Sequence, residues 1–117
     1  MAITSEIIGK LGGADVEATP VAGTASGYTG SIEVLSTIEI PPGETWLVAV
    51  VGQLSAGTSP NTSSPVLRIG DQTSNGYTNS GDFSMATLGT GTVRFQIERK
   101  RSAGADSFTG HVYTVKM

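Results

Sequence analysis

Two stretches of this chain alternate between apolar and polar residues, and this alternation limits the fold more than any other feature. Residues 92–101 and residues 31–40 both repeat with a period of two. Such a period is typical of β-strands with one buried face, so both stretches are predicted to be half-buried strands. The residues predicted to face the core are Val93, Phe95 and Ile97 in the first stretch, and Ile32, Val34, Ile38 and Ile40 with Ser36 in the second.

A third strand is predicted over residues 44–54. Its middle, Trp46–Val51, is apolar on both faces, which indicates a central strand that is covered on both sides. The preceding Pro41-Pro42-Gly43 breaks the ladder, because proline cannot donate and glycine allows positive φ. We therefore expect residues 31–40 and 44–54 to form an antiparallel hairpin.

The rest of the chain predicts shorter strands over residues 65–71, 83–88 and 107–117, separated by Gly-rich and Asn-rich turns. Gly, Ser and Thr supply 44 of the 117 residues, and charged residues only 15%. This composition disfavours helices, and the length suits one domain. Five to seven strands at about ten-residue spacing predict an all-β fold, a single antiparallel β-sandwich or jelly roll.

The domain division predicted is an irregular, extended N-terminal arm over residues 1–30 and a sandwich over residues 31–117. The arm is punctuated by Gly and Pro and has few apolar residues. We expect four of them to dock on a neighbouring subunit, with an unattached terminus as the alternative. These four are Ile3, Ile7, Ile8 and Leu11.

Charge and residue content argue against several classes of function. A net charge of −3 disfavours nucleic acid as a partner, because phosphates demand a basic surface. The chain has no cysteine and a single histidine, His111, which disfavours a transition-metal site. Neither a nucleophile turn nor a recognisable pair of carboxylates indicates an enzyme. No cofactor is expected. Residues 71–82 carry oxygen ligands that suit calcium but lack EF-hand spacing, so that question stays open.

No stretch is long and apolar enough for membrane insertion, and residues 1–10 do not resemble a signal peptide. We therefore expect synthesis in a host cytoplasm.

Interface candidates come from aromatic and charged residues near turns. Tyr28 and Tyr77 lie in Gly-rich loops, where exposed aromatic side chains commonly bind sugars or proteins. Arg99, Lys100 and Arg101 form a cluster that is either a solvated strand end or a contact for an acidic patch. Trp46 is expected in the core rather than in a sugar platform.

Three segments resemble a known family. Ile38–Trp46, with its Pro-Pro-Gly, is similar to a motif of small β-sandwich proteins in bacteriophage particles. Arg99–Tyr113 resembles the closing hairpin of small minor tail proteins of long-tailed phages that infect actinobacteria, and Ile7–Gly13 resembles their leaders. The resemblance implies a structural virion protein of the tail or tail tip, without catalytic residues. Its implied partners are other virion proteins, further copies in a homo-oligomer such as a trimer, and a host-surface glycan.

Two other hypotheses remain open. A capsid decoration protein would share the sandwich, the arm and the oligomeric habit, and would bind the head instead of the tail. A carbohydrate-binding module would need an exposed aromatic platform, and aromatic residues are only 6% of the chain.

Overall fold

The computed structural model describes residues 16–26, 30–55, 65–74, 80–100 and 105–117. These residues form eight β-strands and no helix, so the described chain contains no helix that could cross a membrane. The strands are β1 (Val16–Ala25), β2 (Ile32–Glu39), β3 (Trp46–Ser55), β4 (Val66–Ile69), β5 (Gln72–Thr73), β6 (Gly81–Gly89), β7 (Thr92–Glu98) and β8 (Asp106–Lys116).

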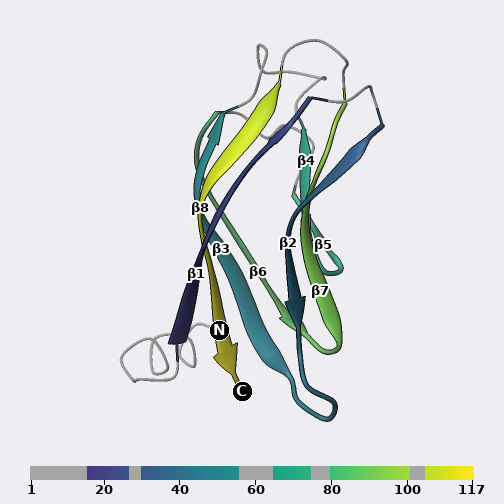
Figure 1. The fold of residues 1–117 in the computed structure, drawn as a ribbon, viewed down its shortest axis with the longest axis vertical. Helices are drawn as coiled ribbons and strands as arrows, with labels where there is room; N and C mark the ends of the chain where they lie inside the picture. The colour runs from purple at the N-terminus through teal and green to yellow at the C-terminus, as the bar shows by residue number, and fades with distance from the viewer. Residues whose placement is uncertain (1–15, 27–29, 56–64, 75–79, 101–104) are drawn as a thin grey trace.

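The strands form two four-stranded antiparallel sheets that face each other (Figure 1). Sheet A has the order β1-β8-β3-β6, and sheet B has the order β2-β7-β4-β5. The pairs β1:β8, β2:β7, β3:β6 and β4:β5 are those of one long hairpin folded over on itself. This is a jelly roll, which confirms the predicted fold class.

The predicted hairpin between residues 31–40 and 44–54 is wrong, because β2 belongs to sheet B and β3 to sheet A. Between them the Glu44 N–H donates to the Pro41 carbonyl at 3.1 Å, and Gly43 has a φ of 82°. This turn carries the chain across the sandwich instead of returning it beside β2. In the jelly roll every connection except β4–β5 crosses between the sheets in this way.

The sandwich begins earlier than the sequence predicts. Val16–Ala25, which the prediction placed in the arm, forms β1 and pairs with β8 along its whole length. The strand is hard to recognise because it contains Pro20 and Gly23. Proline is tolerated here because β1 is an edge strand, where one row of N–H groups has no ladder partner.

The core lies between the sheets and is built around three phenylalanines. Phe95 of sheet B and Phe108 of sheet A meet edge to face with ring centroids 5.0 Å apart, and Phe83 meets Phe108 at 6.1 Å. Such T-shaped pairs add to the stability gained from burying the rings. The prediction that Val93, Phe95 and Ile97 face the core is confirmed, since all three are buried.

The predicted inward face of residues 31–40 is wrong in its first half. The register between β2 and β7 shifts between Val34 and Ser36, which marks a β-bulge at Leu35. An extra residue in one strand moves the side chains of all preceding residues of that strand to the opposite face of the sheet. Ile32 and Val34 therefore lie on the outer surface, 52% and 44% exposed, while Leu35 packs against the core.

Candidate functional site

The outer surface of sheet A consists of the side chains that alternate with core residues along four strands. Val50 pairs with Val112, and both are buried between the sheets, so their strand neighbours point outward. The register of the four strands aligns these neighbours in rows across the sheet, and we call the three rows nearest Val16 face A. The next row, which consists of Ala22, Thr109, Gln53 and Asp82, is polar and forms the boundary of face A. Face A comprises Val16, Val115, Leu47 and Leu88 in the first row, Ala18, Tyr113, Ala49 and Ala86 in the second, and Pro20, His111, Val51 and Ser84 in the third.

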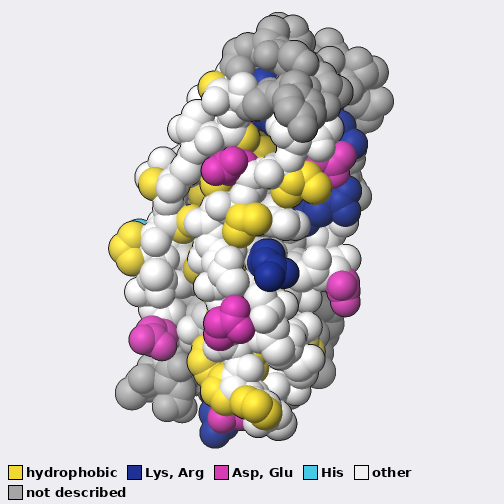
Figure 2. Space-filling view, turned by 45° about the vertical axis from the view of Figure 1, so that its right-hand side comes forward, with side chains coloured by type: hydrophobic (Ala, Val, Ile, Leu, Met, Phe, Trp, Pro, Cys, Tyr) yellow, Lys and Arg dark blue, Asp and Glu magenta, His cyan; other side chains and the backbone are white. Residues whose placement is uncertain are grey.

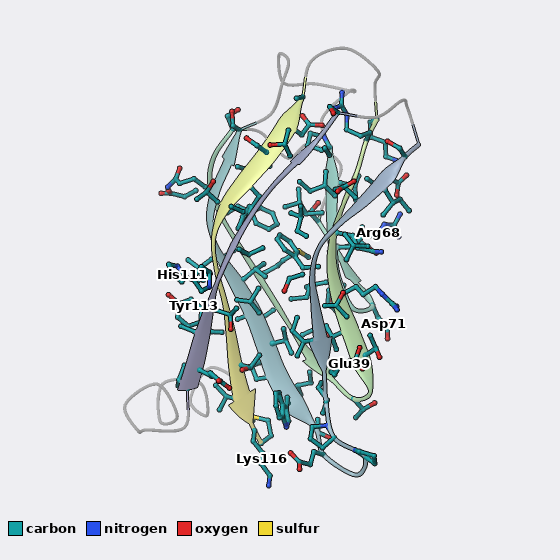
Figure 3. The ribbon with its side chains drawn as sticks, viewed as in Figure 1. Glu39, Arg68, Asp71, His111, Tyr113 and Lys116 are labelled. Carbon is teal, nitrogen blue, oxygen red and sulfur yellow. The ribbon has the colours of Figure 1, made fainter. Side chains whose placement is uncertain are left out.

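None of these twelve residues is Lys, Arg, Asp or Glu. Val51 and Leu88 are 48% and 44% exposed, whereas Leu47 and Val115 are almost fully buried. His111 and Tyr113 project away from the core in Figure 3, with ring centroids 6.1 Å apart. Face A is thus an apolar surface with two aromatic side chains at its centre.

The size of face A follows from the geometry of sheets. Four strands about 4.8 Å apart and three rows about 6.6 Å apart span roughly 400 Å² of sheet. The exposed part is smaller, because Leu47 and Val115 are buried. A contiguous apolar patch of about 300–600 Å² on a monomer is often functional. The second row has the small side chains of Ala18, Ala49 and Ala86 on both sides of Tyr113, so the Tyr113 ring has no large neighbours in its row.

The outer surface of sheet B, which we call face B, is charged. It carries Arg68, Arg94, Glu39 and Glu98 together with the exposed Ile32 and Val34. Figure 2, which brings this side forward, shows blue and magenta side chains interspersed with small yellow patches. Arg68 lies on the opposite side of the sandwich from His111 and Tyr113 (Figure 3).

Glu98 is the centre of an ion-pair network on face B. Its carboxylate accepts hydrogen bonds from the Lys100 ammonium at 2.8 Å and from the Arg68 guanidinium. The hydrogen bond from Lys100, and then that from Arg68, lowers the pKa of Glu98 below its usual value. The Lys100 of the predicted basic cluster therefore lies in a network on this face.

The prediction that Arg99 is an interface residue is wrong, because its side chain is only 1% exposed. Its Nε lies 3.1 Å from Oδ2 of Asp106, which is also buried, and its guanidinium donates to the Ala25 carbonyl. These contacts tie the end of β7 in sheet B to β1 and β8 in sheet A. The sequence pattern Arg99-Lys100-Arg101 does not distinguish a buried cation from exposed ones.

Most other predicted interface residues lie outside the described part of the chain. They are Ile3, Ile7, Ile8, Leu11, Tyr28, Tyr77 and Arg101. Their roles stay predictions. Part of the loop considered for calcium, residues 75–79, is also outside it, and the described residues contain no cluster of three or more metal-ligating side chains.

A groove runs between the edge strands β1 and β2, where the sandwich is open. Its volume is about 240 Å³, and Glu17, Glu39 and Trp46 line it with the hydroxyl side chains Thr19, Ser36, Thr37 and Thr114. The indole Nε1 of Trp46 donates to Glu44 at 2.8 Å, and the Glu39 carboxylate accepts from Thr92 at 2.9 Å. Trp46 packs against the core, as predicted, while also forming part of the groove wall.

Sequence reasoning missed face A. The signal was present in part, since the run Trp46–Val51 is apolar on both faces of its strand. The other three strands contribute Ala, Pro, Ser and His residues that look unremarkable in sequence. Only the register brings them beside Leu47, Ala49 and Val51.

Comparisons with known proteins give little beyond the fold. No family model and no curated protein matches the chain. Among solved structures, the chain is similar to the CBM36-1 domain of a multidomain xylanase from the hindgut metagenome of Trinervitermes trinervoides. The identity is 14%, the TM-score 0.41, and the alignment covers 84% of this chain and 96% of that domain. A similarity this distant carries no argument about function.

Proposed function

We propose that the protein is a structural subunit of a bacteriophage particle, a minor tail protein that binds neighbouring virion proteins through face A. The observation that supports this most is the composition of face A, three rows of outward-facing residues without Lys, Arg, Asp or Glu. The buried centre of a protein interface is depleted in charged residues and enriched in aromatic ones. Tyr113 at the middle of face A is the kind of residue that dominates binding energy.

The sequence resemblance supports the same proposal. The segment Ile38–Trp46 is the part of β2, the crossing turn and β3 that leads into face A at Leu47. A small jelly roll gains stability from association, because a chain of 117 residues buries a limited fraction of its surface alone. These points favour an assembly subunit over a module that acts by itself.

The experiment that tests this proposal is immunogold electron microscopy of purified particles from the source phage. Label at the tail or its tip is the expected result. Label spread over the head would replace the tail assignment with capsid decoration. Absence of label, after a control on disrupted particles that confirms epitope access, would contradict a virion protein.

A second candidate function, carbohydrate binding, is favoured by the groove between β1 and β2. Its lining of two carboxylates, four hydroxyl side chains and an indole suits the hydroxyl groups and apolar ring faces of a sugar. Trp46 is the only tryptophan of the chain, so intrinsic fluorescence reports on this groove directly. Titration with host cell-wall glycans would change the emission if sugars bind there, with Glu39→Gln weakening the effect. Unchanged emission and no binding by calorimetry would exclude the groove as a sugar site.

A further inference from the structure

The four edge strands of the sandwich differ in how they resist pairing with another strand. An edge strand presents unpaired N–H and C=O groups, and proteins block such edges with proline, bulges, charges or shortness. Here β1 contains Pro20, β2 has the bulge at Leu35 with glutamates on both sides of it, and β5 consists of Gln72–Thr73 alone. Three of the four edges therefore carry a recognisable block.

The fourth edge, β6, carries none of these features. It runs for nine residues, Gly81–Gly89, without proline, and its register with β3 is unbroken from end to end. Its single charged residue, Asp82, lies next to its first residue and accepts a hydrogen bond from Gln53 of β3. No strand in the described ranges pairs with the outer edge of β6.

The inner side of β6 is also incompletely covered. Phe83 and Met85 pack against the core but are only partly buried. The facing edge strand of sheet B is the two-residue β5, which is too short to shield all of β6. Apolar side chains next to an unblocked strand edge are the features that another strand would cover.

We propose that β6 pairs antiparallel with β6 of a second copy of this chain, about a two-fold axis at Met85. Met85 is the midpoint of Gly81–Gly89, so this register pairs all nine residues. It places Ser84 opposite Ala86, Phe83 opposite Thr87 and Asp82 opposite Leu88. Each pair joins two outward-facing or two inward-facing residues, as an antiparallel sheet requires, and no like charges stand opposite each other.

Pairing in this register joins the two copies of sheet A into one eight-stranded sheet. Face A then continues across the axis and doubles to roughly 800 Å². The contact is isologous, with the same residues on both copies, and gives a dimer instead of the trimer expected from the sequence. This inference goes beyond the proposed function, because the pairing depends on the edge of β6 and not on where the protein resides.

Two matched substitutions on one row of face A test the pairing. Ala86 on β6 and Ala18 on β1 are both exposed and lie at opposite ends of the second row. The masses of the purified full chain and of Ala86→Lys and Ala18→Lys are measured by light scattering after size exclusion. The wild type and Ala18→Lys are expected at twice the chain mass of 12.0 kDa. Ala86→Lys is expected as a monomer, because two lysines near the axis repel each other.

A cross-linking measurement checks the register. The chain has no cysteine, so Met85→Cys introduces a single thiol, which this register places opposite its own copy. Opposite Cβ atoms in such a pair are about 4.5–5.5 Å apart, which is longer than a relaxed disulfide but within reach of a short thiol cross-linker. A covalent dimer is expected for Met85→Cys and not for Ala18→Cys, with circular dichroism confirming that both fold.

A monomeric wild type at about 100 μM, the range where a weak contact saturates, would overturn the pairing. So would equal dimer content in Ala86→Lys and Ala18→Lys. Either result leaves the immunogold experiment on whole particles unaffected, so failure of the pairing and failure of the proposed function are distinguishable.

Discussion

Face A and face B lie on the two outer sides of one sandwich, and they differ in charge. Face B carries Arg68, Arg94, Glu39 and Glu98, and its glutamate at position 98 holds two cations. Face A carries no Lys, Arg, Asp or Glu in three rows across four strands. Strand alternation alone explains why each sheet has an apolar inner side, but it does not explain why three rows of one outer side are free of charged residues.

The difference indicates that the two faces meet different surroundings. Interspersed charges keep a surface hydrated and discourage association. Exposed valines occur on both faces, Val51 on face A and Val34 on face B, with similar exposures of 48% and 44%. Val34 pairs with Gln96 and lies on a face with two arginines and two glutamates. Val51 lies between His111 and Ser84, and Asp82 is the one charged residue near it on sheet A.

The largest expected effect on stability concerns the buried ion pair that joins the two sheets. Asp106→Ala leaves the buried Arg99 guanidinium without its carboxylate, and a buried uncompensated charge costs about 3–5 kcal/mol of unfolding free energy. Chemical denaturation of the variant and the wild type measures this loss. Lys100→Ala, which removes the adjacent exposed cation, is the control and is expected to change stability by less than about 1 kcal/mol. Similar losses in both variants would contradict a structural role for the buried pair.

The next largest effect on stability is expected in a comparison of Leu47 and Val51, which lie in different rows of face A. Leu47 is buried and Val51 is half exposed, although both point outward from β3. Leu47→Ala is therefore expected to cost about 2–5 kcal/mol, as for other buried leucines. Val51→Ala is expected to stay within about 0.5 kcal/mol, because surface substitutions rarely exceed that. Equal costs in denaturation experiments would show that Leu47 is not buried in solution.

The smallest effect concerns the ion-pair network of face B. The pKa of Glu98 is lowered in the folded protein, so its carboxylate stabilises the fold above its usual pKa near 4.5. That stabilisation is lost as the pH falls through the lower folded pKa. Glu98→Gln should cost less than about 1 kcal/mol at pH 7. The Tm difference from the wild type should shrink at pH 3 and in about 1 M salt. A difference that is constant across pH and salt would contradict the network.

The sequence predicts the elements of the sandwich better than its connections. Alternation located β2, β7 and the apolar centre of β3, because their inner residues are large and regularly spaced. It missed β1, where Pro20 and Gly23 replace typical strand residues. It also paired β2 with β3 as a hairpin, because local pattern does not tell whether a Pro-Pro-Gly turn returns or crosses.

Face A could not be predicted from the sequence pattern for a related reason. Face A is a product of register, which aligns residues up to about 100 positions apart, such as Val16 and Val115. The bulge at Leu35 shows the same dependence, because one extra residue moved Ile32 and Val34 from the predicted core to face B. The burial of Arg99 likewise depends on its ion pair with Asp106 at the start of β8, and no sequence motif predicts that pairing.

Binding through face A is tested most directly by comparing the incorporation of Val51→Lys and Val34→Lys into assembled particles. Both substitutions place one lysine at a half-exposed valine, on face A and on face B respectively, and both should fold with a Tm near that of the wild type. Tagged variants are supplied during infection, and their copy number in purified particles is measured by quantitative immunoblot. The copy number of Val51→Lys is expected to fall by roughly tenfold or more, as loss of about 1.4 kcal/mol of binding free energy requires, while that of Val34→Lys is expected to stay at the wild-type level. Normal incorporation of Val51→Lys, or equal loss of both variants, would contradict the assignment of face A as the binding surface.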